Sequence, residues 1–223
     1  MIKMINKKMD IVFEDKYLLI INKPAKLLTV ATDKEKEKTL YHEASMYVKK
    51  KHKSNKIFIV NRLDKDTSGI VVFAKDEKTK RVLQDNWDKY AVKREYIALV
   101  KGKINPKKDT LKNKLVETKT NLVYIDEKSK IGKLAITKYE FIKEINGNSL
   151  ISIEILTGRK NQIRVQLNNI NHPVIGDMKY GKNKSFYNRL MLHANKLILI
   201  NPITNEKLEL ESRLPKEFIN IIK

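Results

Sequence analysis

Short apolar runs separated by polar turns dominate the pattern of this chain, and they predict strands. Residues 11–22 form two such runs around the charged residues 14–16, which is typical of a hairpin. Pro24 should end the second strand, because proline has no N–H to donate to a sheet. The runs at residues 57–60 and 70–73 predict a second pair of strands with a polar turn between them.

Further runs of the same kind follow along the chain. Asn146-Gly147-Asn148 is a strong hairpin signal, since Asn and Gly tolerate the positive φ angles of a tight turn. The remaining predicted strands are residues 94–100, 134–142, 150–156, 197–200 and 207–210. Short strands joined by short turns favour antiparallel pairing.

Helices are expected between the strands. Thr39 and Asp76 are suitable N-caps, since their side-chain oxygens can accept hydrogen bonds from the first backbone N–H groups. The first helix should run into the lysine-rich residues 49–53, and the second should end near Tyr90. Two more helices are expected, at residues 161–169 and after Pro215.

Residues 101–133 are mostly polar and rich in lysine, with one short apolar group at residues 122–125. We expect them to form an excursion between two halves of one sheet, not a linker between domains. The whole chain, residues 1–223, therefore predicts a single α+β domain with a mixed, largely antiparallel central β-sheet flanked by helices. A hydrophobic content of 41% supports a folded core.

The charge of the chain is strongly positive, with 47 Lys and Arg against 26 Asp and Glu and a formal net charge of +21. Such a surface attracts polyanions at long range, and nucleic acid is the first candidate. A general abundance of lysine on solvated surfaces is the alternative explanation, and it accounts for part of the excess.

The chain has no cysteine, which excludes disulfides, thiolate zinc sites and a cysteine nucleophile. Its four histidines are scattered without metal-ligand spacing. The amino-terminal residues contain no apolar stretch long enough for a signal peptide or a membrane span. We therefore expect a soluble cytoplasmic protein with no metal and no membrane partner.

Asp64 lies in the polar turn between the second pair of predicted strands. Strand, turn and strand hold one carboxylate rigidly at the mouth of a cleft, and Arg62 would share its face. Residues 64–69 also match the first half of a calcium loop, but the twelfth position is Lys75 instead of Glu, which excludes an EF-hand. Two alternatives remain open: a magnesium site at Asp64 and Asp66, and a plain turn aspartate that caps local backbone groups.

Three further segments carry candidate chemistry. Tyr96 lies among apolar residues of a predicted strand, where a core position is the alternative. Residues 157–164 gather polar side chains where a strand gives way to a helix, whose start favours an anion. Taken alone, Arg164 would be a solvated helix charge. Residues 172–181 form a loop with two glycines, for which a simple turn is the alternative.

In order and spacing these segments resemble one family, the RluA-type RNA pseudouridine synthases. That family carries the motifs HRLD-x-x-TSG, K-x-Y-x-A, TGR-x-HQIR and HP-x-x-GD-x-x-YG. The chain reads NRLDKDTSG, KREYIA, TGRKNQIR and HPVIGDMKYG at the corresponding places. The opening hairpin and the late segment RLMLHANKL are also similar, so the resemblance spans roughly residues 11–210. It implies the pseudouridine synthase fold, with a catalytic cleft across the sheet.

The resemblance implies an isomerase that detaches the uracil of an RNA uridine from ribose C1′, turns the base and rejoins it through C5. Asp64 would act on the sugar, as nucleophile at C1′ or as base at C2′, and Arg164 would favour its charged form from the other half of the fold. Tyr96 would stack on the uracil and help to remove the C5 proton. Arg62 would grip the RNA as the target base flips into the pocket. The implied substrate-binding residues are Arg62, Asn61, Thr67, Arg159, Gln162 and Ile163.

The resemblance implies no cofactor, since the uracil never leaves the pocket. The implied partner is ribosomal or transfer RNA, and the family is commonly monomeric. The chain is expected to begin directly with the catalytic domain, without the S4 RNA-binding module of some relatives. A non-catalytic RNA-binding protein on the same scaffold is the alternative. Such a protein would have lost Asp64, Tyr96 or Arg164, and all three are present.

The chain departs from the family motifs at three positions. Asn61 and Asn161 stand where the family usually has histidine, and an amide can still donate and accept hydrogen bonds. Lys26 replaces a glycine that follows Lys-Pro-Ala. These departures bear on RNA contacts and local support, not on the reaction itself.

Overall fold

The apolar runs form a mixed, largely antiparallel sheet in the computed structural model, which describes residues 9–33, 35–182 and 187–222. The strand order is β1-β2-β4-β10-β5-β9-β8-β6-β7, with β3 paired to β4 and β11 paired to β10. Among the described strands, only β4 and β10 pair in parallel. The expected α+β class, with its largely antiparallel sheet, is confirmed.

The first half of the sheet has apolar clusters on both faces of its central strand, β4. Its strands are β1 (Ile11–Glu14), β2 (Leu18–Lys23), β3 (Phe58–Ile59), β4 (Ser68–Ala74), β10 (Leu192–Ile200) and β11 (Lys207–Glu211). Along β4, Ile70 and Val72 join one apolar cluster, whereas Val71 and Phe73 join another on the opposite face. Every residue of β4 is buried, as expected of a central strand covered on both sides.

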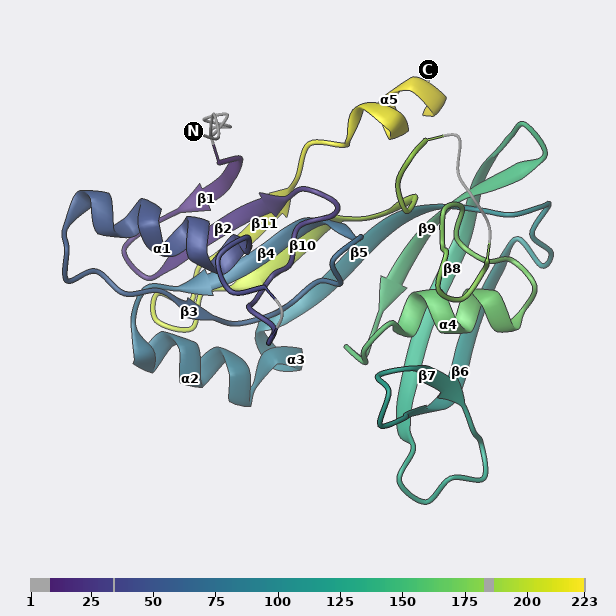
Figure 1. Ribbon diagram of the computed structural model, residues 1–223, viewed down its shortest axis with the longest axis horizontal. Coiled ribbons are helices and arrows are strands. Elements are labelled where there is room, and N and C mark those ends of the chain that lie inside the picture. Colours follow the sequence, from purple (N-terminus) through teal and green to yellow (C-terminus); the bar gives the residue numbers. More distant parts are fainter. Residues whose placement is uncertain (1–8, 34, 183–186, 223) are drawn as a thin grey trace.

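The long strand β5 (Ala91–Val100) connects this half of the sheet to the other (Figure 1). It pairs with β10 on one side and with β9 on the other. The second half contains β9 (Asn148–Ile155), β8 (Lys133–Ile145), β6 (Lys108–Glu117) and β7 (Val123–Ile125). Residues near the middle of β5 therefore lie where the two halves meet.

Helices cover the faces of the sheet. Helix α1 (Leu40–Lys51) begins where Thr39 accepts a hydrogen bond from the His42 backbone, and it packs against β2 and β4. Helix α2 (Glu77–Asp85) is capped by Asp76, as expected. The other helices are α3 (Trp87–Tyr90), α4 (Gln162–Asn169), which lies in the second half of the molecule, and α5 (Lys216–Ile222) (Figure 1). No helix in the described ranges is long and apolar enough to cross a membrane.

Three expectations need correction. The helix expected from Asp76 to Tyr90 is interrupted at Asn86, whose φ of −131° and ψ of 36° are not helical, so it becomes α2 and α3. Residues 101–133 contain two strands, β6 and β7, which extend the sheet. Strand β6 is difficult to recognise in the sequence, because most of its side chains are exposed and polar. The strand expected at residues 197–200 begins five residues earlier, at Leu192.

Candidate active site

The loop between β3 and β4 carries Asp64 and is tied down from two directions. Thr29 donates its hydroxyl to the Leu63 carbonyl at 2.7 Å and accepts the Leu63 N–H at 3.2 Å. Within the loop, the Thr67 N–H donates to the Asp64 carbonyl at 3.2 Å, which closes a turn. The carboxylate therefore stands on a loop whose backbone is fixed on both sides of it.

Lys23, at the end of β2, also supports the Asp64 loop. Its side chain is fully buried, and its Nζ donates to the carbonyls of Pro24, Leu27 and Lys65 at 3.0, 2.7 and 3.1 Å. Three acceptors match the three N–H bonds of an ammonium group. Burial lowers the pKa of Lys23 to about 7, although the charges of Asp66 and Asp64 oppose that shift. Sequence reasoning missed this lysine, because a lysine beside a proline is ordinarily a surface residue.

Gly69 explains the glycine of the Thr-Ser-Gly segment that follows the loop. Its φ is +119°, and a Cβ at this position would lie 2.1 Å from the Ala194 carbonyl oxygen. Strand β10 approaches β4 this closely because the two strands pair in parallel at Gly69 and Ala194. Only glycine lets the two backbones meet here, and the meeting fixes the position of the Asp64 loop relative to β10.

Tyr96 lies near the middle of β5, opposite Ala194 of β10 and Ile153 of β9. Burial raises the pKa of its phenol to about 12, so the hydroxyl stays protonated at neutral pH. No residue in the described part of the chain hydrogen-bonds to this hydroxyl. The side chain is half-buried and lines the cavity described below.

Arg164 reaches the site from α4 and holds Asp64 from the opposite wall. Its Nη1 lies 3.2 Å from Oδ2 of Asp64 and 3.3 Å from Oδ1 of Asn161. Its Nε and Nη2 both donate at 2.8 Å to the carboxylate of Asp177, which forms a bidentate pair. The Arg164 side chain is 7% exposed and that of Asp64 is 28% exposed. The guanidinium is therefore buried, whereas the carboxylate it holds remains open to a ligand.

Asp177 is the anchor of this arrangement. It is buried, and it also accepts the backbone N–H groups of Lys179 and Tyr180 at 3.0 Å. Burial alone would raise the pKa of Asp177, but its hydrogen bonds with Arg164 lower it. Burial alone would lower the pKa of Arg164. The hydrogen bonds and charges of Asp177 and Asp64 outweigh burial and raise this pKa. Both groups are therefore ionised, and sequence reasoning assigned Asp177 no role although it lies in the last of the four motifs.

A cavity of about 470 Å³, open to solvent, brings the expected site residues together. Eight of the nine residues singled out in the sequence line it: Asp64, Tyr96, Arg164, Arg62, Thr67, Arg159, Gln162 and Ile163. They come from the β3–β4 loop, from β5 and from the start of α4. The expected cleft across the sheet thus lies at the junction between its two halves.

Asn61 is the ninth residue, and it does not line the cavity. Its Oδ1 accepts the Val72 N–H at 2.8 Å, so the side chain stabilises the β3–β4 pair. Asn161, the other asparagine at a family histidine position, lines the cavity with a φ of 54°. It donates to the Tyr180 hydroxyl at 2.9 Å and accepts from Arg164, so it supports the guanidinium.

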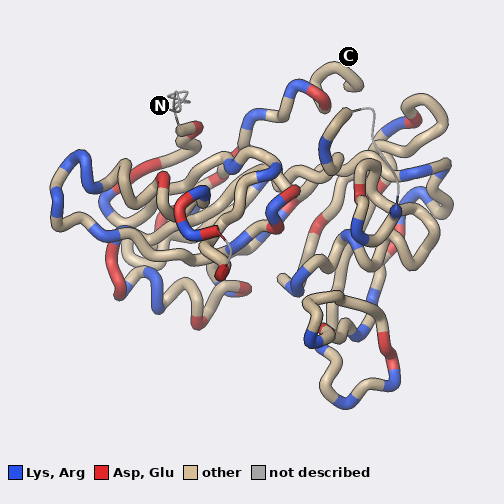
Figure 2. The backbone as a smooth tube through the Cα atoms, viewed as in Figure 1, with Lys and Arg blue, Asp and Glu red and all other residues tan. Residues whose placement is uncertain are grey.

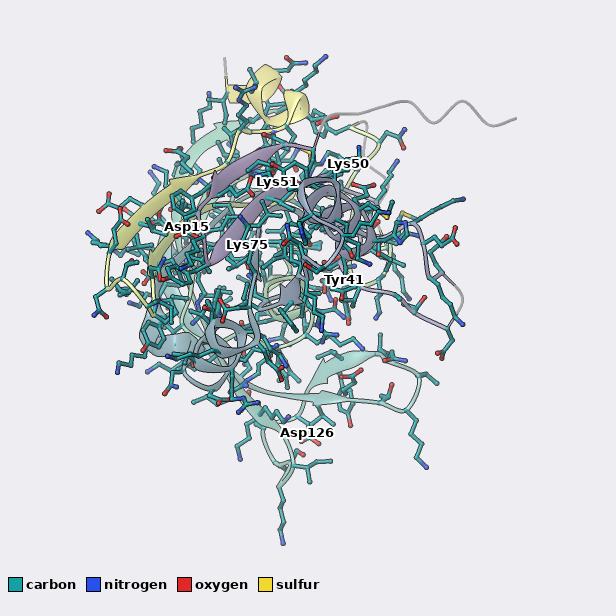
Figure 3. The ribbon with its side chains drawn as sticks, turned by 90° about the vertical axis from the view of Figure 1, so that its left-hand side faces the viewer. Asp15, Tyr41, Lys50, Lys51, Lys75 and Asp126 are labelled. Carbon is teal, nitrogen blue, oxygen red and sulfur yellow. The ribbon has the colours of Figure 1, made fainter. Side chains whose placement is uncertain are left out.

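Lys and Arg residues are spread along the backbone of both halves of the molecule (Figure 2). Lys50, Lys51 and Lys75 gather around the end of α1 (Figure 3). Lys51 and Lys75 are paired with Glu14 at 2.8 and 2.7 Å. Burial would raise the pKa of Glu14, but its hydrogen bonds with the two lysines lower this pKa to about 2. Two of these three lysines are thus committed to a contact within the protein.

The two carboxylates of the possible magnesium pair point into different spaces. Asp64 lines the cavity described above, whereas Asp66 lines a second one. Within the residues that the structure describes, no group of three or more His, Cys, Asp or Glu side chains is placed to hold a metal ion. A carboxylate, a buried guanidinium and a protonated phenol face one open cavity, and such a set can perform acid–base or nucleophilic chemistry on a planar ring bound between them.

The chain is similar to known proteins along most of its length. Residues 17–169 match the family described as RNA pseudouridylate synthase. An uncharacterized RNA pseudouridine synthase of Bacillus subtilis is 34% identical over 218 residues, which cover 97% of this chain and 72% of that protein. The tRNA pseudouridine synthase C of Haemophilus ducreyi is 29% identical, covering 95% of this chain and 93% of that protein. The ribosomal large subunit pseudouridine synthase C of Buchnera aphidicola is 32% identical, covering 96% and 69%.

Solved structures share the fold. The human protein named RNA pseudouridylate synthase domain containing 4 superimposes with a TM-score of 0.80 at 23% identity, covering 96% of this chain and 91% of that one. The human protein named RNA pseudouridylate synthase domain containing 1 superimposes with a TM-score of 0.74, covering 93% of this chain and 84% of that one. The architecture of the sheet is therefore that of the pseudouridine synthases.

Proposed function

This chain belongs to the RNA pseudouridylate synthase family as an RluA-type member, and from that premise we propose how its cavity isomerises a uridine of RNA. The enzyme is an RNA pseudouridine synthase, an isomerase. In the proposed reaction the C1′–N1 bond of a bound uridine breaks, the uracil turns within the cavity, and a C1′–C5 bond forms. The proton on C5 then leaves, and N1 gains a proton.

Asp64 acts on the ribose in this proposal, as nucleophile at C1′ or as base at C2′. The support for it is its position: the carboxylate is partly exposed, fixed on a rigid loop and held by a buried guanidinium. Arg164 orients Asp64 and stabilises its negative charge, and Asp177 keeps Arg164 in place. This contact across the cavity is the single observation on which the proposal rests.

Tyr96 receives the uracil. Its ring lines the cavity beside Asp64, and a base can stack on it while it turns. The phenol is protonated at neutral pH, so it serves as a hydrogen-bond donor or passes a proton through water, and it does not act as a preformed base. A protonated phenol also avoids placing a second anion next to Asp64.

The target base has to unstack from its neighbours in the RNA before it can enter the cavity. Flipping a base costs a few kcal/mol, and less in a single-stranded loop than in a helix. Arg62 is exposed at the rim of the cavity, where it can fill the vacated space or hold the displaced backbone. The excess of positive charge supports the remaining RNA through its phosphates.

We propose ribosomal or transfer RNA as the substrate, because relatives that cover most of this chain are named for those RNAs. An enzyme of either RNA would meet its substrate in the cytoplasm. The test is to map pseudouridines by carbodiimide modification in RNA from cells with and without this gene. The expected result is one or a few sites that disappear with the gene and return with purified enzyme in excess EDTA. An unchanged map would refute the proposed activity, and a requirement for a divalent metal would favour the magnesium alternative.

A further inference from the structure

A second cavity lies next to the active site and shares Arg164 with it. Its volume is about 980 Å³, and it is open to solvent. Its lining comes from the loop after β2, the Asp64 loop, α4 and the segment between α4 and β10. The residues are Lys26, Asp66, Arg164, Gly176, Met178, Lys179, Asn188, Arg189 and Leu190. Four of these side chains are cationic and one is anionic, which favours an anionic ligand.

Two of the four cations are already committed to protein contacts. Arg164 is held by Asp177, Asp64 and Asn161, as described above. Arg189 donates to the Leu190 carbonyl and to the Ser68 hydroxyl. It also lies 3.6 Å from Glu217. The other two, Lys26 and Lys179, are exposed, and the ammonium group of each makes one hydrogen bond to a described residue, which leaves N–H donors for a ligand.

Lys26 occupies an unusual backbone position. Its φ is +68°, in the left-handed region that glycine adopts readily and a lysine adopts at a cost. A side chain kept in a strained position is a reason to look for a function of that side chain. Its Nζ contacts Asn188 Oδ1 at 3.3 Å, and no other hydrogen-bond acceptor holds it within the described ranges. The backbone at Lys26 thus directs an exposed ammonium group to this cavity.

Lys179 extends the same positive surface. Its Nζ donates to the Asn121 carbonyl at 2.8 Å and lies 5.3 Å from the centre of the Tyr180 ring. Asp66 is the one anion of the lining, and no described residue donates a hydrogen bond to it. An acceptor beside two lysines disfavours a free phosphate dianion. It suits a phosphodiester whose sugar offers a hydroxyl to Asp66.

We propose that this cavity binds the RNA backbone next to the target uridine, with the phosphate at Lys26 and Lys179 and the adjoining ribose at Asp66. The proposal rests on the pseudouridine synthase activity proposed above and assigns a substrate subsite to it. Because the two cavities share Arg164, a phosphate held here would fix the register of the strand that delivers its neighbour to Asp64. Lys26 would then contribute to RNA binding and not to the bond-breaking step.

The test measures tritium release from total RNA labelled with [5-³H]uridine and taken from cells that lack this gene. Lys26→Gln removes the charge, Lys26→Arg keeps it, and Lys26→Gly removes it while relieving the backbone. Lys78→Gln is the matched control, since Lys78 is an exposed lysine on α2 that lines neither cavity. Apparent KM, kcat and melting temperature are measured for each variant over a series of KCl concentrations.

We expect Lys26→Gln and Lys26→Gly to raise the apparent KM about threefold to tenfold and to leave kcat within about twofold. The slope of log KM against log salt should fall by about 0.7–0.9, as expected for one lost phosphate contact. Lys26→Arg and Lys78→Gln should behave like the wild type, and Lys26→Gly should melt no lower than the wild type. A wild-type KM and salt slope for Lys26→Gln would overturn the subsite, as would a normal KM for Lys26→Gly. Absence of tritium release from the wild-type enzyme would instead refute the proposed function.

Discussion

At the scale of single residues, the site depends on how one guanidinium is divided between two carboxylates. Arg164 gives Nε and Nη2 to the buried Asp177, which leaves Nη1 for the more exposed Asp64. The bidentate pair fixes the plane of the guanidinium, and this fixes the direction from which Asp64 is held. We therefore expect the pair to serve both the stability of the fold and the position of Asp64, the proposed reactive group.

Replacing Arg164 by methionine tests the structural part of this statement. Arg164→Met would leave Asp177 as a buried charge without its partner, and we expect the free energy of unfolding to fall by about 3–5 kcal/mol. Arg62→Met is the matched control, since Arg62 is exposed, and it should change stability by no more than about 0.5 kcal/mol. Urea unfolding at neutral pH measures both. Equal stabilities of the two variants would show that the Arg164–Asp177 pair is not a structural element.

Tyr96→Phe separates the two roles assigned to the tyrosine. The ring, which we propose stacks on uracil, survives this change, whereas the hydroxyl does not. If the hydroxyl takes part in proton transfer, kcat should fall about 10²-fold to 10⁴-fold while RNA affinity stays close to that of the wild type. Single-turnover rates with saturating enzyme give the comparison. An unchanged rate would leave Tyr96 with stacking alone.

At the scale of elements, the parallel contact of β4 with β10 positions the Asp64 loop. Gly69 lies in that contact with a positive φ and no room for a Cβ. Asn61 and Thr29 then hold the chain on the other side of Asp64, through Val72 and Leu63. The turn is rigid because strands and side chains on both sides of it leave its backbone little freedom.

Gly69→Ala should therefore be far more damaging than an alanine at another glycine with positive φ. The new Cβ would overlap the backbone of Ala194, which cannot move without breaking the β4–β10 pair, and we expect a loss of more than about 3 kcal/mol. Gly147→Ala is the control. Gly147 has a φ of +74° but open space around it, so only about 1 kcal/mol of backbone cost is expected there. Similar losses in denaturant unfolding would contradict the close-contact explanation.

Much of this arrangement was predictable from the sequence, because local chemistry determines it. The caps at Thr39 and Asp76 and the hairpin at Asn146 and Gly147 follow from side-chain and backbone preferences of those residues, and all are confirmed. Strand β6 was not predicted, because a strand with a largely exposed polar surface lacks the apolar alternation that reveals strands. Local sequence patterns do not predict an element whose conformation depends on its tertiary contacts.

The site was predictable to the same extent. Motif spacing brought together eight residues that share one cavity. It did not reveal the supports of that cavity, Lys23 and Asp177, because burial of a charged side chain depends on contacts with residues distant in the sequence. It also could not show that Asn61 bonds to Val72 instead of facing the cavity.

At the scale of the whole molecule, a buried chain of hydrogen bonds links β4 and β10 to the residue that follows β11. Arg189 donates to the Ser68 hydroxyl, which leaves that hydroxyl free to donate to His193 Nδ1 at 2.7 Å. Nε2 of His193 then carries the hydrogen and donates to Ser212 at 2.9 Å. His193 is thus neutral, and burial followed by the charge of Arg189 lowers its pKa to about 3.

This histidine makes the stability of the fold sensitive to acid. Between pH 6.5 and 3 the unfolded chain binds a proton at His193 that the folded chain does not, so stability is lost as pH falls through that range. The loss at pH 5 relative to pH 8 should be about 2 kcal/mol, given an unfolded pKa near 6.5. Denaturant unfolding of the wild type and His193→Gln at both pH values gives the comparison. Between pH 8 and pH 5 the free energy of unfolding of His193→Gln should fall by about 2 kcal/mol less than that of the wild type. An identical pH dependence of the two proteins would show that His193 does not cause the effect.

The central claim is that Asp64, held across the cavity by Arg164, performs the chemistry on the ribose. The most direct measurement compares Asp64→Asn with the wild type in single-turnover conversion of RNA, with Asp85→Asn as the control, since Asp85 is exposed on α2 and lines neither cavity. We predict no detectable pseudouridine from Asp64→Asn, with RNA affinity within about threefold of the wild type because the amide keeps the shape of the side chain. Asp85→Asn should react at the wild-type rate. Pseudouridine formation by Asp64→Asn at close to the wild-type rate would contradict the account.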